Sequence, residues 1–157
     1  MRIGVLSDTH GLLHFIEKAV KVMEPVDLIL HAGDVSADAD FLREAYNYRV
    51  YGVSGNCDTG SEYPGERLIE LEGKKILLTH GHGYRVKYGY ERLLARAKEL
   101  FADAVVFGHT HCPENTRVGN VLIFNPGSPA LPRCGAGRTF GVLEIRDGDI
   151  RGCIMEL

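Results

Sequence analysis

The sequence lacks the features that would place the chain in a membrane or on a secretion route. No apolar run approaches the roughly 20 residues that a helix needs to span a bilayer. The first residues contain no basic stretch followed by an apolar run and a cleavage site, so no secretory signal is expected. We therefore expect no membrane span and no membrane partner.

Cysteine is scarce, and its spacing matches no known framework. The four cysteines, Cys57, Cys112, Cys134 and Cys153, lie far apart and form no C-x-x-C pair. This pattern is typical of neither a disulfide scaffold nor a zinc knuckle, and it predicts free thiols in a reducing cytoplasm. We expect Cys112, Cys134 and Cys153 to be small buried hydrophobic residues.

Two common modes of nucleotide binding also lack support. The net charge is −3 and the basic residues are scattered, whereas a protein that neutralises many backbone phosphates should be basic. No extended nucleic-acid surface is therefore expected, although one phosphate in a pocket is left open. The first apolar run is followed by Ser7-Asp8-Thr9-His10-Gly11 rather than G-x-G-x-x-G, which argues against a Rossmann-type dinucleotide site.

The sequence does contain a regular succession of short apolar runs. With 157 residues, no internal repeat and no linker, residues 1–157 fit a single domain. Helical spacing of apolar residues predicts helices from Leu12 to Met23, from Asp38 to Tyr46 and from Tyr88 to Phe101. An α/β domain with helices outside and sheet inside follows from this alternation. The expected strands cover residues 3–6, 28–30, 50–53, 76–78, 104–107, 121–124, 140–145 and 150–155.

Metal-binding residue types follow five of these predicted strands. In a largely parallel sheet the ends of such strands share one edge, where α/β proteins place their ligands. Five segments that are distant in the sequence should therefore converge on one crevice. They are Asp8-Thr9-His10, Gly33-Asp34, Gly55-Asn56-Cys57-Asp58, His80-Gly81-His82-Gly83 and Gly108-His109-Thr110-His111.

The donor types in these segments favour a transition metal. Aspartate, asparagine and histidine offer oxygen and imidazole nitrogen, which suits Mn, Fe, Co, Ni or Zn better than Ca or Mg. In an extended segment His10 would lie on the same side as Asp8, and His111 on the same side as His109. The glycines before Asp34, Asn56 and His109 would allow the backbone to approach a ligand closely.

In this order, the five segments resemble the signature of the calcineurin-like metallophosphoesterases. His31-Ala32-Gly33-Asp34 and Asn125-Pro126-Gly127-Ser128 also resemble the small single-domain phosphodiesterase branch of that superfamily. The resemblance extends from Arg2 to about Ile145. It implies a double β-sheet sandwich flanked by helices and a metal-dependent phosphoesterase, in the first place a phosphodiesterase, that acts on small phosphate esters.

The resemblance also implies a division of metal ligands. Asp8, His10 and His111 would hold one ion, and Asn56, His80 and His109 a second, with Asp34 bridging both. Two divalent transition-metal ions, with Mn²⁺ favoured and Ni²⁺, Fe²⁺, Co²⁺ or Zn²⁺ as alternatives, would share a hydroxide that attacks phosphorus in line. The oligomeric state is not predicted, and a homo-oligomer is left open.

The chain departs from the family pattern at the residue that protonates the leaving oxygen. Many members carry Gly-Asn-His followed by Asp or Glu, whereas this chain has Cys57 followed by Asp58. A thiol of pKa about 8.5 can donate a proton, but nearby cations favour the thiolate, and Asp58 opposes that effect. Cys57 is therefore either a catalytic acid or a small residue in the former histidine position. His82 is the alternative acid, or else a loop histidine that contacts phosphate or solvent.

Three further residues have less specific expectations. His31 should orient a metal ligand rather than bind metal itself. We expect His14 to lie on the surface of the first helix. Arg133 has two interpretations, an arginine that reaches a phosphate and an exposed structural residue.

A different class of function is a non-catalytic scaffold for protein assembly. One retromer subunit resembles this family's fold and serves assembly, so fold alone does not establish activity. All seven expected ligands are present in this sequence, which favours the enzyme.

Overall fold

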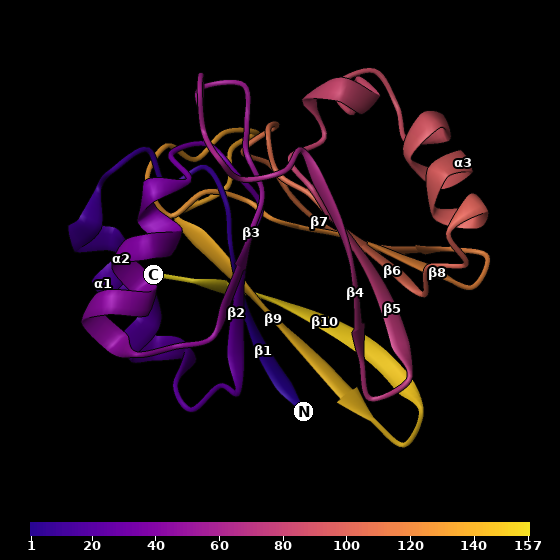
Figure 1. The fold of residues 1–157 in the computed structure, drawn as a ribbon, viewed down its shortest axis with the longest axis horizontal. Coiled ribbons are helices and arrows are strands. Elements are labelled where there is room, and N and C mark those ends of the chain that lie inside the picture. The colour runs from indigo at the N-terminus through magenta and orange to yellow at the C-terminus, as the bar shows by residue number, and fades with distance from the viewer.

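Two five-stranded β-sheets packed face to face form the centre of the protein, as the computed structural model of residues 1–157 shows (Figure 1). The strand order is β10-β9-β1-β2-β3 in the first sheet and β4-β5-β6-β8-β7 in the second. The first sheet contains β1 (Arg2–Leu6), β2 (Leu28–His31), β3 (Val50–Gly52), β9 (Thr139–Arg146) and β10 (Asp149–Glu156). The second contains β4 (Glu66–Leu71), β5 (Lys74–Thr79), β6 (Ala104–Val106), β7 (Pro113–Val118) and β8 (Val121–Pro126).

Both sheets are mixed, with three adjacent parallel strands in each. In the first sheet β1 pairs in parallel with β2, and β2 with β3. In the second, β5 pairs in parallel with β6, and β6 with β8. The remaining strands run antiparallel to their neighbours. The expectation of one largely parallel sheet is thus replaced by two shorter parallel sets.

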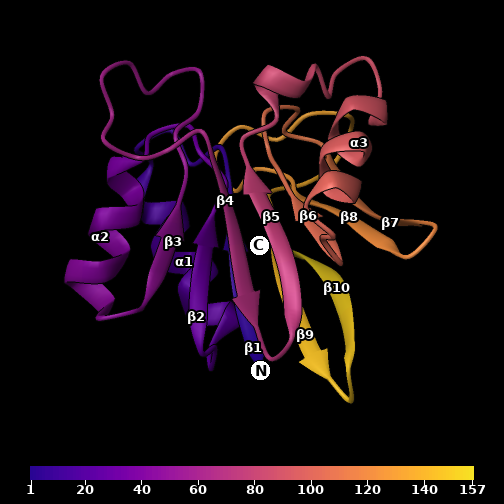
Figure 2. The ribbon, with the colours of Figure 1, turned by 45° about the vertical axis from the view of Figure 1, so that its right-hand side comes forward.

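Three apolar layers hold the elements together. The inner layer lies between the sheets and includes Phe124 and Leu143. Helices α1 (Leu13–Met23) and α2 (Ala37–Tyr46) cover the outer face of the first sheet, and α3 (Glu91–Glu99) covers that of the second (Figures 1 and 2). This arrangement confirms the predicted α/β double-sheet sandwich flanked by helices.

The predicted helices are right in position and partly wrong in extent. The third helix is shorter than expected, because the chain turns at Phe101, whose φ is 53° and whose side chain is 80% exposed. Leu12 is 41% exposed and precedes the first helix instead of contributing to its buried face. No helix in the structure combines the length and the apolar character that crossing a membrane requires.

The expectation for the cysteines was wrong in two respects. Cys112 and Cys134 form a disulfide with a Cα–Cα distance of 5.6 Å, and neither residue belongs to the buried core. The loop that contains Cys134 returns to the His111 segment, where the Arg133 amide donates to the His111 carbonyl at 3.2 Å. Cys57 and Cys153 are free, and both are exposed, so Cys153 is not the buried residue that we expected.

Candidate metal centre

The predicted candidate residues lie on the loops that follow five parallel strands from both sheets. Asp8 and His10 follow β1, Asp34 follows β2, and Asn56 follows β3. The other two loops, after β5 and β6, carry His80 and the pair His109 and His111. Backbone hydrogen bonds join these loops, from the Asp8 amide to Gly33 at 3.0 Å and from the Gly108 amide to His80 at 3.1 Å.

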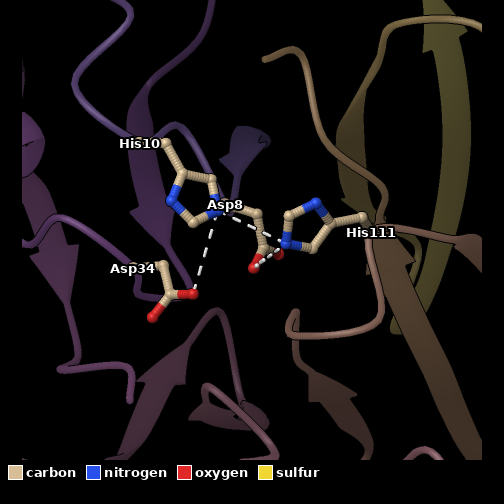
Figure 3. Close-up of side chains that lie close together, drawn as sticks. All are labelled: Asp8, His10, Asp34 and His111. Carbon is tan, nitrogen blue, oxygen red and sulfur yellow. Dashed lines mark hydrogen bonds and ion pairs between the residues drawn. The ribbon is translucent and has the colours of Figure 1, made fainter. Parts of the chain in front are cut away.

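Four of the candidate ligands form a first cluster, composed of Asp8, His10, Asp34 and His111. Their ligand atoms all lie within 4.8 Å of one another (Figure 3). The Nε2 atoms of His10 and His111 are 3.3 Å apart, and His111 Nε2 lies 3.2 Å from Asp8 Oδ1. On the opposite side of the cluster, His10 Nε2 is 3.9 Å from Asp34 Oδ2.

A second cluster, composed of Asp34, Asn56, His80 and His109, adjoins the first. His80 Nε2 lies 3.4 Å from Asp34 Oδ1 and 3.2 Å from Asn56 Oδ1. The ring centroid of His109 is 5.1 Å from that of His80. Asp34 thus directs Oδ2 toward the first cluster and Oδ1 toward the second.

Backbone carbonyls orient two of the imidazole rings. The Nδ1 atom of His80 is 2.7 Å from the Ala32 carbonyl, and that of His111 is 2.6 Å from the Leu131 carbonyl. A carbonyl only accepts, so each Nδ1 carries the proton and donates it. Each ring therefore directs Nε2, the atom that a metal-binding histidine held in this way offers, into the cluster.

The two carboxylates are buried without a lysine or arginine partner. Asp8 is fully buried, Asp34 is 3% exposed, and the only basic side chains in ion-pair range of either are histidines. Burial alone would raise the pKa of Asp8, but its hydrogen bond to His111 and the nearby positive charge of His80 lower it below its ordinary value. Carboxylate oxygens and imidazole nitrogens that converge in this way make a donor set that fits a divalent cation.

The surroundings raise the pKa of one histidine of the site and lower that of another. The hydrogen bond to Asp8 is the main reason that the pKa of His111 is raised. Burial, followed by the charge of His80, lowers the pKa of His109 to about 4. The His109 imidazole is therefore neutral near pH 7 and can offer a lone pair.

The backbone is strained at five of the seven candidate ligands. Left-handed conformations of residues other than glycine are uncommon and cluster at functional sites. This geometry also corrects one expectation, because neither the Asp8–His10 nor the His109–His111 segment is extended. The φ angles are 53° at Asp8, 49° at His10, 58° at Asp34, 67° at His109 and 58° at His111.

The three predicted catalytic residues lie beside the second cluster. Cys57 donates its amide to Asp34 Oδ1 at 3.0 Å, and its exposed thiol is 3.6 Å from Asn56 Nδ2. Burial within its loop and the adjacent Asp34 raise the pKa of the Cys57 thiol. Asp58 accepts hydrogen bonds from the amides of Ser36 and Gly55, each at 2.7 Å.

His82 belongs to a short 3₁₀ turn, η1 (His82–Tyr84), rather than to an extended segment. Its ring centroid nevertheless lies 5.3 Å from that of His80 and 6.1 Å from that of His109. Burial, followed by the charge of His80, lowers the pKa of His82.

The less specific candidates are placed as follows. His31 is fully buried within β2, and its Nε2 lies 2.9 Å from Thr9 Oγ1. His14 is exposed on α1. Arg133 is also exposed, and its backbone amide binds the His111 carbonyl.

Sequence reasoning assigned no role to several residues that support Asp8. Ser7 Oγ donates to Asp8 Oδ2 at 2.7 Å, and Ser128 Oγ donates to the Asp8 carbonyl at 2.7 Å. Asn125 Nδ2 donates to the Gly108 carbonyl at 3.0 Å. The Asn125-Pro126-Gly127-Ser128 motif was the available signal, since two of its polar side chains brace the loops of the first cluster.

Comparison with known proteins identifies the family. Residues 1–148 match the calcineurin-like phosphoesterase superfamily domain. The chain is 34% identical over 149 residues to the probable metallophosphoesterase YsnB of Bacillus subtilis, covering 94% of this chain and 86% of that protein. It is 30% identical over 179 residues to the phosphodiesterase MJ0936 of Methanocaldococcus jannaschii, covering 99% and 100% of the two chains.

Solved structures share the fold. A predicted phosphoesterase from Streptococcus pneumoniae matches with a TM-score of 0.84 and 28% identity over 99% of this chain and 88% of that one. Vps29 from Entamoeba histolytica, solved with Zn²⁺, matches with a TM-score of 0.77 over 99% and 98% of the chains. At 22% identity this second likeness concerns the fold alone.

Proposed function

This chain belongs to the calcineurin-like phosphoesterase superfamily, and we propose that it is a metal-dependent hydrolase of small phosphate esters, in the first place of phosphodiesters. The observation that carries the proposal is the position of Asp34. Its two carboxylate oxygens face two different groups of ligand atoms, at 3.9 Å from His10 Nε2 and 3.4 Å from His80 Nε2. Such an arrangement suits a carboxylate shared by two cations.

Each cluster receives one ion in this proposal. Asp8, His10 and His111 hold the first, Asn56, His80 and His109 hold the second, and Asp34 binds both. Two divalent cations supply Lewis-acid polarisation of the phosphoryl oxygens and activation of water at neutral pH. The nitrogen-rich donor set supports a transition ion, and Mn²⁺ is our first choice.

The chain itself fixes the geometry of the reaction site. The carbonyls of Ala32 and Leu131 hold the His80 and His111 rings with Nε2 directed inward. Asp58 braces the Ser36 and Gly55 amides, so we assign it a positioning role instead of a direct part in proton transfer.

The proton for the leaving oxygen has two possible donors in this structure. Cys57 and His82 both lie next to the second cluster, within one residue of Asn56 or beside the His80 ring. His82 is neutral near pH 7 and must first take up a proton, whereas the Cys57 thiol carries one. The leaving-group dependence of the rate in Cys57→Ala and His82→Ala distinguishes the two donors, because only the variant that lacks the acid should selectively lose cleavage of alkyl esters.

The scaffold alternative has less support. The Vps29 structures show that this fold also occurs in proteins that are not named phosphoesterases. However, the buried carboxylates and facing imidazoles of the first cluster have no evident use in a scaffold without metal. We also propose that residues 1–157 act as one domain, which the family match over residues 1–148 supports. We keep the cytoplasm as the proposed compartment, although the Cys112–Cys134 disulfide removes the free-thiol argument for it.

Chelation followed by metal restoration tests the function. Chelator-treated protein should lose hydrolysis of bis(4-nitrophenyl) phosphate, and Mn²⁺ should restore it. Lewis-acid stabilisation is worth several kcal/mol, so Asp34→Asn should lower kcat/KM on the order of 10³-fold. Asp40→Asn, at an exposed position of α2, is the matched control. Undiminished activity in metal-free protein would overturn the proposal, and equal losses for Asp34→Asn, His10→Ala and His80→Ala would refute the shared carboxylate.

A further inference from the structure

A buried chain of hydrogen bonds holds the loop that carries Asp8 and His10. Thr9 Oγ1 lies 2.5 Å from Asp38 Oδ2 and 2.9 Å from His31 Nε2. The amide of Gly11 donates to the same Asp38 oxygen at 2.9 Å. His31 and Thr9 are fully buried and Asp38 is 3% exposed, so water does not compete for these bonds.

The number of donors and acceptors on each group determines the direction of each hydrogen bond. The Thr9 hydroxyl has one proton and donates it to Asp38 Oδ2, because that acceptor is much nearer than the Asp34 carbonyl at 3.5 Å. The Thr9 oxygen then accepts from His31, which places the His31 proton on Nε2. The Nδ1 atom of His31 has no hydrogen-bond partner, as this tautomer allows, because Nδ1 is then a bare acceptor and not an orphaned N–H. Burial, opposed by the charge of Asp38, lowers the pKa of His31 and keeps the ring neutral.

The chain of hydrogen bonds ends at Thr9, between two residues with left-handed backbone conformations. Thr9 stands between Asp8 and His10, whose φ angles are 53° and 49°. Such conformations persist only when the surroundings over-determine them. Asp38 secures the loop at two successive points, the Thr9 hydroxyl and the Gly11 amide, on either side of His10.

We propose that Asp38 and Thr9 are positioning residues for the first metal ion, acting through the loop that presents Asp8 and His10. The inference rests on the metal assignment of the proposed function. Its specific content is selectivity. The hydrogen bonds to Asp38 and His31 do not reach Asn56, His80 or His109, and the longer contact of Thr9 Oγ1 with Asp34, at 3.5 Å, is to the backbone carbonyl and not to the shared carboxylate. The affinity for the second ion should therefore change little when either residue is replaced.

Metal titration of paired variants tests this selectivity without substrate. Mn²⁺ affinity is measured by calorimetry, and the spin coupling of the two ions by electron paramagnetic resonance. The first site is identified as the one lost in His111→Ala. Removal of supporting hydrogen bonds around a metal ligand usually costs about 10–100-fold in affinity, so Thr9→Val and Asp38→Ala should weaken the first site by that factor. The second site should change less than about twofold, a negligible difference in binding free energy.

Conservative variants separate positioning from general packing. Thr9→Ser keeps the hydroxyl, and Asp38→Asn can keep both bonds because both end on the single oxygen Oδ2. Both variants should recover most of the first-site affinity. Asp40→Ala, on the same helix but exposed and bonded to Arg43, should match the wild type. If Asp38→Ala fails to fold, the comparison of first-site affinity between the near-isosteric Thr9→Val and the hydroxyl-retaining Thr9→Ser tests the inference on its own.

Three outcomes would overturn the inference. They are unchanged affinity at both sites in Thr9→Val, equal weakening of the two sites, and loss of thermal stability with first-site affinity intact. A wild-type chain that binds no Mn²⁺ would overturn this inference together with the proposed function. Selective weakening of the first site in a protein that hydrolyses no phosphate ester would refute the proposed function alone.

Discussion

Replacing Gly55 with alanine should remove most of the activity, because Asp34 occupies the space of the new methyl group. An ideal Cβ at Gly55 would lie 2.2 Å from Asp34 Oδ1 and 2.5 Å from the Asp34 amide nitrogen. Cβ contacts below 3.0 Å essentially never occur, so the two groups must separate by 3.0 − 2.2, or about 0.8 Å. Hydrogen bonds restrict the movement of both loops. The Gly55 amide donates to Asp58 Oδ2 at 2.7 Å, and the Cys57 amide donates to Asp34 Oδ1 at 3.0 Å.

This displacement acts on the carboxylate that both ions are proposed to share. A misplacement near 1 Å can cost about 10²-fold in rate, so we expect kcat/KM to fall by at least that factor. Overpacking should also lower the free energy of unfolding by about 1–3 kcal/mol. The assay compares diester hydrolysis at saturating Mn²⁺, bound metal and thermal unfolding.

Gly83→Ala provides the matched control for this variant. Its added Cβ would meet no atom within 4 Å, although Gly83 adjoins His82. It should therefore behave like the wild type. If Gly55→Ala kept both ions and lost less than about threefold in kcat/KM, equivalent to well under 1 kcal/mol, the close packing of Asp34 would have no functional role.

Three further predictions concern the ligands, the proton donor and the disulfide. His109→Ala and His111→Ala should each retain one ion by elemental analysis, but a different one; a variant that loses no metal would refute its assignment. Cys57→His should flatten the dependence of rate on leaving-group pKa and favour alkyl esters by up to about 10²–10⁴-fold, whereas selective loss of alkyl-ester cleavage in Cys57→Ala would identify the thiol as the acid. Reduction of Cys112–Cys134, which closes a loop with a sequence separation of 22, should lower the free energy of unfolding by about 3 kcal/mol. The Cys112→Ser/Cys134→Ser double variant should have the melting temperature of the reduced protein. A wild-type melting temperature that does not change when a dithiol is added would contradict this expectation.

The sequence predicted the inner strands better than the outer ones, for a physical reason. Strands β1 and β8 are covered on both faces and therefore read as continuous apolar runs. The edge strands β4 and β7 are partly or largely exposed, and their sequences alternate or are polar. Edge strands of this kind carry little hydrophobic signal, and both were missed.

The candidate residues could be found from sequence because the chemistry requires particular side chains at strand ends. The supports could not, because many of them are backbone atoms. The Leu131 carbonyl that orients His111 has no residue-type signature. Asp38 was read only as the start of a helix, and its bond to the Gly11 amide depends on tertiary packing. The Cys112–Cys134 pair likewise depends on how a loop returns, which spacing does not reveal.

The strained backbone bears on the choice between enzyme and scaffold. Five candidate ligands adopt a left-handed conformation that glycine would adopt without strain. Asp and His tolerate it better than most residues, yet at about 1 kcal/mol each the total is about 5 kcal/mol, comparable to the whole stability of a marginal domain. Asp8 and His111 recover part of this cost through hydrogen bonds within the protein, such as those from Ser7 Oγ and to the Leu131 carbonyl. A divalent cation would offset more of the cost, since the donors that these side chains present suit one. Metal binding does not by itself separate an enzyme from a scaffold, because Vps29 was also solved with Zn²⁺, so hydrolysis of a phosphodiester decides between them.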